Sequence, residues 1–273
     1  MKNKLTIIAL LVLILMSSCQ GFNRLLNYSD PSYRYEEAKT LFAKGDYQKT
    51  VTVLNDLIVL LKGSDKGEES LYMMGMSYYQ DSDLQMAHEA FSQYVTTYPR
   101  GTFIELARFY SAKSLYLDSP EARLDQSATY SAISELQTFV ELFPQSEHRN
   151  EVEFMIFDLQ DKLVEKELLS ARLYYNMGNY LGNNYLSCII TAQNALKEYP
   201  YTDHREELSF LIMRAKFDMA QNSVVSKRTE RYRDAQDECY AFKNEFPESL
   251  YIEQADEMLA KTNRYLENVG DDD

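Results

Sequence analysis

Tryptophan is absent from the 273-residue sequence, which also has only nine glycines, six prolines and three cysteines. Proteins built from β-strands need more glycine and proline than this for their many turns, so the composition favours helices. Hydrophobic residues make up 45% of the chain, which is enough for a sizeable core in one or two domains. We therefore expect an all-α protein.

Positive charge is also in short supply. The chain has 28 lysine and arginine residues against 42 aspartates and glutamates, which gives a formal net charge of −14. Such a chain would repel phosphate groups, and the sequence offers no basic face to bind them. The charge therefore argues against nucleic acid as a partner.

Catalytic and cofactor motifs are missing as well. The sequence contains no Walker-type phosphate loop, no dinucleotide-binding glycine pattern, and neither HExxH nor GxSxG. His148 and His204 each follow a proline by four residues, and these equivalent positions favour a structural or surface role. His88 has no cysteine or histidine nearby to complete a metal site. We expect no enzymatic activity, no cofactor and no bound metal.

Residues 1–18 are expected to form a signal peptide rather than part of the fold. Lys2 and Lys4 give a positive start, and an apolar run of twelve residues, Leu5–Met16, follows. At a rise of about 1.5 Å per residue this run is too short to cross a hydrocarbon core of about 30 Å. The segment is therefore not expected to be a stable membrane span.

Cys19 is the predicted site of lipid attachment. The small residues Ser17 and Ser18 before it resemble a bacterial lipobox, in which a peptidase cuts before the cysteine and the cysteine is acylated. Met16 stands where that motif usually has leucine. Acyl chains would then hold the protein on a membrane. The alternative is an ordinary signal peptide followed by a chance cysteine.

The residues that follow indicate the destination. Gln20 is not aspartate, which in the enterobacterial sorting rule resembles an outer-membrane signal, and residues 21–24 lack the acidic character of surface-export signals. We expect a lipid-anchored protein on the periplasmic face of the outer membrane. Its expected parts are an acylated tether over residues 19–32, a helical repeat domain over 33–267 and an acidic tail over 268–273.

Four of the six prolines follow an aromatic residue. The residue before a proline avoids the α region, so each such pair is expected to end a helix. The intervals between the four prolines are 45, 56 and 47 residues, which indicates a repeated unit. The pairs are Tyr98-Pro99, Phe143-Pro144, Tyr199-Pro200 and Phe246-Pro247.

The residues in front of Pro99 resemble a tetratricopeptide (TPR) repeat. Gly75 and Ala87 are small residues where two helices must approach closely, and Tyr78 and Phe91 fill the space beside them. Similar residues precede the other three prolines, and an earlier copy includes Gly45-Asp46-Tyr47 as a turn. We therefore expect a superhelical α-solenoid of about five TPR-like helix pairs plus a C-terminal capping helix near residues 249–267.

A TPR usually repeats every 34 residues, so the longer intervals need extra length. We place it in longer helices and in loops near residues 118–126 and 222–228. A helix cap is expected after each aromatic-proline pair, and Thr102 with Glu105 matches a capping box. The expected caps are Thr102, Ser146, Thr202 and Ser249.

Cys188 and Cys239 fall at apolar helix positions. A periplasmic location would permit a disulfide bond, but the sequence does not bring the two residues together. Buried free thiols are therefore expected.

The basic segment over residues 226–234 stands out in an acidic protein. Arg228 and Arg231 could meet an acidic partner surface. The alternative is a solvated helix start in which neighbouring acids such as Glu230 and Asp234 neutralise these arginines locally.

Two segments, residues 123–146 and 159–175, resemble the BamD family of lipoproteins of the outer-membrane β-barrel assembly machinery. The resemblance implies a scaffold without catalytic activity. It also implies that the C-terminal repeats bind the periplasmic domains of a BamA-type barrel protein, and that the N-terminal repeats receive unfolded outer-membrane proteins. Arg205 is the nearest match to the arginine through which the family contacts BamA.

First helices of TPR units line a concave surface that can hold an extended peptide. Barrel proteins end in aromatic-rich strands, which would suit a groove lined by tyrosine. The residues predicted to line it are Tyr35, Tyr72, Tyr79 and Arg108.

Two other functions remain open at this point. The chain could be a nutrient-binding surface lipoprotein, although such proteins are usually rich in tryptophan, on which sugars stack. It could also be a TPR-type periplasmic adaptor for cell-division or peptidoglycan proteins.

Overall fold

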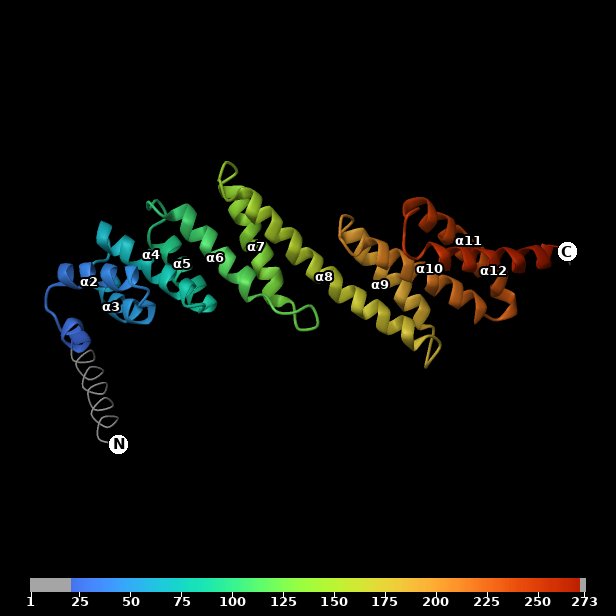
Figure 1. Ribbon diagram of the computed structural model, residues 1–273, viewed down its shortest axis with the longest axis horizontal. Coiled ribbons are helices and arrows are strands. Elements are labelled where there is room, and N and C mark those ends of the chain that lie inside the picture. Colours follow the sequence, from blue (N-terminus) through green and yellow to red (C-terminus); the bar gives the residue numbers. More distant parts are fainter. Residues whose placement is uncertain (1–20, 271–273) are drawn as a thin grey trace, which may run out of the picture. The chain divides into compact units, whose positions relative to one another are not determined.

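The computed structural model describes residues 21–270, and that part of the chain is helical without a β-strand (Figure 1). The expected five helix pairs and capping helix are confirmed, and we number the repeats one to five by these pairs. The helices are α2 Pro31–Ala43, α3 Tyr47–Leu60, α4 Asp65–Gln80, α5 Leu84–Thr97, α6 Ile104–Asp118, α7 Ser127–Leu142, α8 Arg149–Met177, α9 Asn184–Glu198, α10 Arg205–Gln221, α11 Val225–Glu245 and the cap α12 Ile252–Gly270.

The helices belong to two compact units. The first unit contains the residues up to Ser119 together with Ala128–Glu153, and the second contains Pro120–Ser127 and the residues from Phe154 onward. In the first unit α2, α3, α4, α5 and α6 pack in chain order, each on the next. In the second unit α9, α10, α11 and α12 do the same. Each unit is thus built from neighbouring hairpins, as helical repeats require.

The residues before the prolines end their helices in one shared conformation. Tyr98 has φ −126° and ψ 64°, Tyr199 has φ −126° and ψ 73°, and Phe246 has φ −126° and ψ 65°. These ψ values lie outside the α region, as the ring of the following proline demands. The amide of each residue still donates to the carbonyl four residues earlier, so the last turn closes before the chain leaves the helix.

The hydroxyl residues after the prolines hold the next turn in three repeats. Each hydroxyl oxygen accepts a hydrogen bond from the amide two residues later, at 2.9–3.2 Å. Such short-range bonds satisfy an amide ahead of a helix start. The hydroxyl residues are Ser146, Thr202 and Ser249.

Thr102 does not form this bond, and the predicted capping box with Glu105 was wrong. The predicted cap at Thr202 was wrong as well, since the N-cap of α10 is His204, without a side-chain bond. Helix α6 has Phe103 at its N-cap, and no side chain caps it by a hydrogen bond. The Thr102 amide instead donates at 2.5 Å to Glu68 of α4, whose carboxylate also accepts from Tyr94 at 2.5 Å. A distant carboxylate has replaced the local cap.

Acidic residues of first helices anchor two later turns in the same way. The Asp161 carboxylate of α8 accepts from the Thr202 hydroxyl and, at 3.0 Å, from the Asp203 amide. Glu206 of α10 accepts from the Ser249 hydroxyl at 2.5 Å. Hydrogen bonds to charged groups are the stronger ones, so these contacts tie the turns after the second, fourth and fifth repeats to the first helix of the same repeat.

The extra length lies mainly within helices. Helix α8 has 29 residues and α11 has 21. The loop predicted near residues 118–126 is present between α6 and α7, but the one predicted over 222–228 is short, since α10 ends at Gln221 and α11 begins at Val225.

The segment after the predicted lipid site is more ordered than expected. Residues 21–26 are helical, and Phe22, Leu25 and Leu26 pack against the core formed by α2, α3 and α4. The predicted tether over 19–32 therefore includes a packed segment. Cys19, the predicted signal peptide over 1–18 and the end of the predicted tail, residues 271–273, lie outside the described residues.

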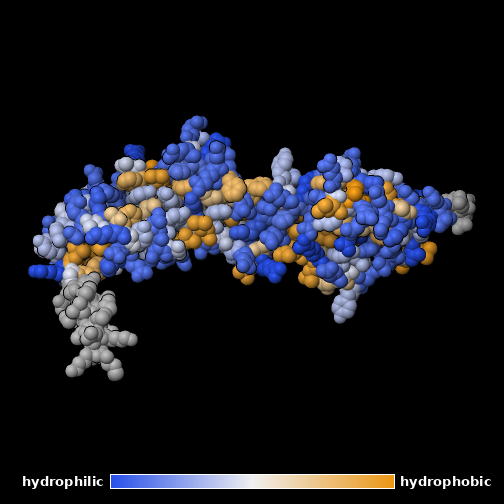
Figure 2. Space-filling model, in the orientation of Figure 1, coloured by the Kyte–Doolittle hydropathy of each residue, from blue (hydrophilic) through white to orange (hydrophobic). Residues whose placement is uncertain are grey.

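The surface seen in Figure 2 is largely hydrophilic, with hydrophobic side chains in several separate areas. Between residues 21 and 270, none of the helices combines the length and apolar character that crossing a bilayer would require.

Cys188 and Cys239 are buried free thiols, as expected. They belong to different clusters of the second unit, the first with α8, α9 and α10 and the second with α10, α11 and α12. Burial raises the pKa of both thiols to about 12.

Both thiols should resist a thiol-specific reagent such as Ellman's reagent between pH 7 and 9, because only the thiolate reacts and burial keeps it protonated. Unfolding in guanidinium should release two reactive thiols in a protein that begins at residue 21. Since these folded-state pKa values are raised, stability should fall as the pH rises above the pKa of an exposed thiol, about 8.5. Rapid labelling of the native protein at pH 7 would contradict this placement.

Gly75 packs against the ring of Phe91, as the TPR-like spacing predicts. A Cβ at Gly75 would lie 2.6 Å from the nearest ring atom of Phe91, which is fully buried. Such a ring has little room to move, since interiors are close-packed.

Replacing Gly75 by valine should therefore lower the free energy of unfolding by about 2 kcal/mol, the usual cost of overpacking. Gly21→Val is the control, because a Cβ there meets no atom within 4 Å. Urea unfolding followed by circular dichroism measures both, and equal midpoints for the two variants would count against the close helix contact.

Candidate protein-binding surfaces

Within residues 21–270, no three or more histidine, cysteine, aspartate or glutamate side chains gather closely enough to hold a metal ion. His88 Nδ1 lies 2.9 Å from Ser111 Oγ, but Ser111 is buried between α5 and α6, where a substrate could not reach it. This contact joins two helices rather than activating a nucleophile.

Tyr35, predicted to line a groove, lies in the core. Only 3% of its surface is exposed, and its hydroxyl donates to Glu69 of α4. Burial, followed by this hydrogen bond, raises the pKa of Tyr35 to about 12. The ring has no free face for a ligand, so we withdraw Tyr35 from the proposed groove.

Tyr72 is half-buried on α4 and stacks on Phe103, with ring centroids 4.5 Å apart and planes inclined by 11°. Phe91 and Tyr94 lie at 5.8 and 6.1 Å from it. Desolvation in this aromatic cluster raises the pKa of Tyr72 to about 12. The partly exposed ring thus holds the start of α6 against α4.

Tyr79 is the first ring of a ladder that crosses from α4 to the start of α8. It meets Tyr110 edge-on at 5.0 Å, Tyr110 meets Phe109 at 5.1 Å, and Phe109 stacks on His148 at 4.0 Å. Phe109 is buried, whereas the other three rings are partly exposed. We call these four residues the aromatic ladder.

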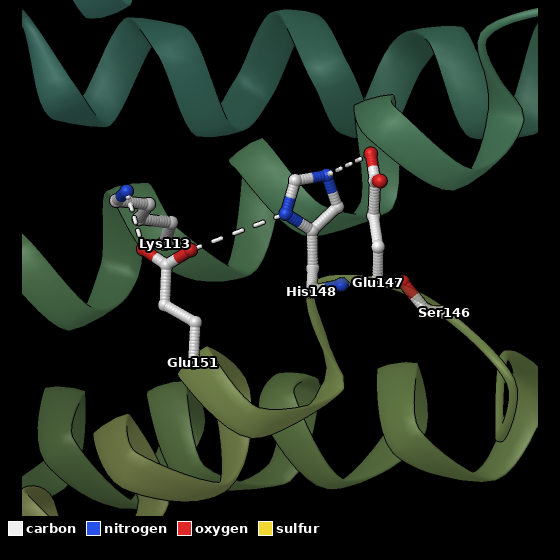
Figure 3. Close-up of polar contacts among 5 residues, drawn as sticks. All are labelled: Lys113, Ser146, Glu147, His148 and Glu151. Atoms are coloured by element: carbon white, nitrogen blue, oxygen red, sulfur yellow. Dashed lines mark hydrogen bonds and ion pairs between the residues drawn. The ribbon is translucent and has the colours of Figure 1, made fainter.

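Charged groups surround the ladder at His148 (Figure 3). Glu147 and Glu151 flank the imidazole, each with a carboxylate oxygen 3.9 Å from a ring nitrogen. Glu151 also accepts a hydrogen bond of 2.7 Å from Lys113, whose Nζ lies 5.3 Å from the centre of the Phe109 ring. Rings, a cation and carboxylates thus meet at one edge of the first unit.

Arg108 lies half-buried on α6, next to the ladder residue Phe109 in sequence. Two hollows of the first unit lie elsewhere. One, of about 540 Å³, is lined by the Tyr28–Tyr33 pair and residues 21–25, and the other, of about 640 Å³, by residues 142–148 and the start of α6. The second hollow includes the ladder residue His148, and neither hollow is lined by Tyr72, Tyr79 or Arg108.

The three arginines predicted to meet a partner are engaged within the chain. Arg205 donates at 2.5 Å to Glu245 and at 3.1 Å to the Pro200 carbonyl. Arg228 donates to the Ser223 carbonyl at 2.8 Å, and Arg231 to the Ser223 hydroxyl at 2.5 Å. The last two close the turn between α10 and α11 by bonds to Ser223 rather than to the neighbouring acids, while contact with a partner surface stays a prediction.

Sequence reasoning missed Tyr110 and the role of His148 as the end of the ladder. The sequence did contain a pattern that indicates the role of His148. Phe103 and Tyr251 also follow a proline by four residues, and they stack on Tyr72 and Phe210 at 4.5 and 4.0 Å. A ring four residues after the proline is therefore a recurring packing position.

Comparison with known families gives one match over most of the repeats. The model of the family described as "YfiO: Outer membrane lipoprotein" matches residues 28–182. Two curated relatives are each named "Outer membrane protein assembly factor BamD". The one from Caulobacter vibrioides is 22% identical and aligns with 81% of this chain and 72% of its own length. The one from Rickettsia prowazekii is 19% identical, over 71% and 76%.

Among solved structures, the chain is similar to TPR-like repeats from Podosopora anserina, at 14% identity and a TM-score of 0.33. The alignment covers 81% of this chain and 100% of that one. At this score the likeness is no argument about the fold, which rests on the helices described above.

Proposed function

Because the chain belongs to the outer membrane lipoprotein family whose model matches residues 28–182, we propose that it is a non-enzymatic scaffold for assembling β-barrel proteins in the outer membrane. The observation that carries the proposal is the match to this family, together with two relatives named as outer membrane protein assembly factors. The chain aligns with more than two thirds of each relative, so the comparison concerns most of both proteins.

The physical character of the described residues supports a role in binding polypeptides. Paired helices stacked in chain order offer extended faces rather than a closed cavity. The aromatic ladder brings partly exposed rings together with Lys113 and Glu151 at one edge of the first unit. Such a surface can hold an apolar, aromatic-rich segment by ring contacts and by hydrogen bonds at its rim.

We propose that Cys19 carries the acyl chains that hold the protein on the periplasmic face of the outer membrane. Lipid anchoring needs no apolar helix, since two or more chains suffice for stable attachment.

The proposed partners are a BamA-type barrel protein, bound by the C-terminal repeats, and unfolded outer-membrane proteins, received by the N-terminal repeats. Arg205 remains the candidate for the first contact, although a partner would have to compete with Glu245 for its guanidinium. Tyr72, Tyr79 and Arg108 remain candidates for the second. We add Tyr110, which lies between Tyr79 and Phe109 in the ladder.

Affinity purification from detergent-solubilised outer membranes tests the assembly role. A tagged full-length protein should recover a BamA-type barrel protein in amounts comparable to its own. Recovery of a SusC-like nutrient transporter, or of cell-division or peptidoglycan proteins, in place of the barrel protein would overturn the proposal. A Cys19→Ala protein should be released from the membrane fraction, which tests the anchor separately.

Peptide binding tests the ladder. Tyr79→Ala should weaken binding of a C-terminal peptide of a barrel protein roughly fivefold, because an exposed ring that contacts a ligand contributes about 1 kcal/mol. Tyr180→Ala is the matched control, since Tyr180 is 69% exposed and lies in the second unit, outside the ladder. Fluorescence anisotropy with a labelled peptide measures both, and equal affinities for the two variants would count against the ladder.

A further inference from the structure

A cation on the first helix of a repeat and a carboxylate from the helix that follows the repeat form an ion pair twice in the described residues. In the third repeat Phe109 of α6 stacks on His148, and Lys113, one turn further along α6, places its Nζ 5.3 Å from the centre of the Phe109 ring. Glu151, seven residues after Pro144, accepts a hydrogen bond of 2.7 Å from that lysine (Figure 3). The carboxylate of the following helix thus neutralises the cation.

The fourth repeat has the same pair. Glu207 lies seven residues after Pro200 and forms an ion pair with Arg172 of α8. Arg172 follows the buried residue Leu168 by four positions, as Lys113 follows Phe109. Position seven after the proline therefore supplies an internal carboxylate in two consecutive repeats.

The fifth repeat keeps the rings and the cation but lacks the acid. Phe210 of α10 stacks on Tyr251 at 4.0 Å with planes inclined by 10°, and Arg214 lies 5.4 Å from the centre of the Phe210 ring. Seven residues after Pro247 stands Gln254, an exposed neutral amide. Within residues 21–270, no carboxylate forms an ion pair with Arg214.

Arg214 lies beside a hollow of about 280 Å³ in the second unit. The hollow is lined by Arg172, Glu207, Tyr175, Phe210, Tyr251 and Arg214, among others. Two acids of this region have partners within the chain. Glu207, which lines the hollow, pairs with Arg172, and Asp218, four residues after Arg214, accepts a hydrogen bond from the Tyr175 hydroxyl.

The guanidinium of Arg214 therefore combines three properties of an anion receptor. It is half-buried, it lies over two aromatic rings, at 4.7 Å from the centre of Tyr175 as well as over Phe210, and no carboxylate neutralises it. A guanidinium whose face is covered by rings still presents its N–H groups at the edge, in the fork geometry that suits a carboxylate.

We propose that this hollow binds the side-chain carboxylate of a glutamate or aspartate from a partner polypeptide, in the role that Glu151 has toward Lys113 in the third repeat. Both internal examples are side-chain carboxylates, which favours this source over the terminal carboxylate of a chain. The rings of Phe210 and Tyr251 offer an apolar wall for the methylene groups of the incoming side chain. The inference does not depend on the proposed role in barrel assembly.

The test uses acetyl-Phe-Glu-amide, whose only carboxylate is the glutamate side chain, and the protein from residue 21 onward. Titration followed by the NMR signals of the arginine Nε–H groups should give a saturable shift at Arg214. The isosteric acetyl-Phe-Gln-amide should bind roughly tenfold more weakly or not at all, since the charge-assisted bond is lost. Acetyl-Phe, with only a terminal carboxylate, tests the other source.

Three variants test the inference further. Gln254→Glu restores the internal acid and keeps Arg214, so it should reduce the affinity for acetyl-Phe-Glu-amide roughly tenfold. Gln221→Glu adds the same charge at an exposed position at the end of α10 and should leave the affinity unchanged. Arg214→Gln should abolish binding, measured here by isothermal titration calorimetry because the variant lacks the Arg214 signal, with its folding checked by circular dichroism.

Equal binding of the glutamate and glutamine dipeptides would overturn the inference, as would binding that survives both Gln254→Glu and Arg214→Gln. A stronger response to acetyl-Phe than to acetyl-Phe-Glu-amide would also overturn it, because the ligand would then be a terminal carboxylate.

Discussion

The turn that follows each aromatic-proline pair is the point on which the repeats depend, because it decides where one hairpin ends and the next begins. The proline removes the α conformation from the residue before it, so the helix stops without a glycine. The chain must then start a new helix within a few residues. A hydroxyl inside the turn, or a carboxylate from the first helix of the same repeat, holds the amides that this start leaves unpaired. The proline ring, which acts locally, and a carboxylate from another helix thus both determine the conformation of this turn.

The contrast between local steric effects and contacts with distant residues explains which parts of the structure the sequence could predict. Proline, glycine and aromatic spacing act over a few residues, so the helix ends, the five pairs and the contact of Gly75 with Phe91 were predictable. Thr102 was not, because its partner Glu68 lies 34 positions away, in another helix. The prediction that Tyr35 lines the groove was wrong for the same reason, because its hydroxyl donates to the distant residue Glu69 of α4.

In the candidate site, too, contacts between residues far apart in the sequence could not be predicted. Counting tyrosines on first helices found Tyr72 and Tyr79, because both fall on the expected faces of α4. It did not find the ladder, which depends on Phe109 and His148 lying face to face across two repeats. The sequence also could not show the internal partners of the two arginines in the basic segment. Arg228 and Arg231 look available in sequence, yet both end on Ser223, where they close a turn.

The repeat architecture also gives a reason for the difference at Arg214. Lys113 and Arg172 each have a carboxylate from the helix that opens the next repeat. For the fifth repeat that helix is α12, which opens no further pair and serves as the cap of the second unit. Partly exposed ion pairs contribute at most about 1 kcal/mol, so glutamine at position 254 costs the fold little. With glutamine at this position, the guanidinium of Arg214 lies over Tyr175 and Phe210 without an acid from α12. It is therefore available to an acid from outside the chain.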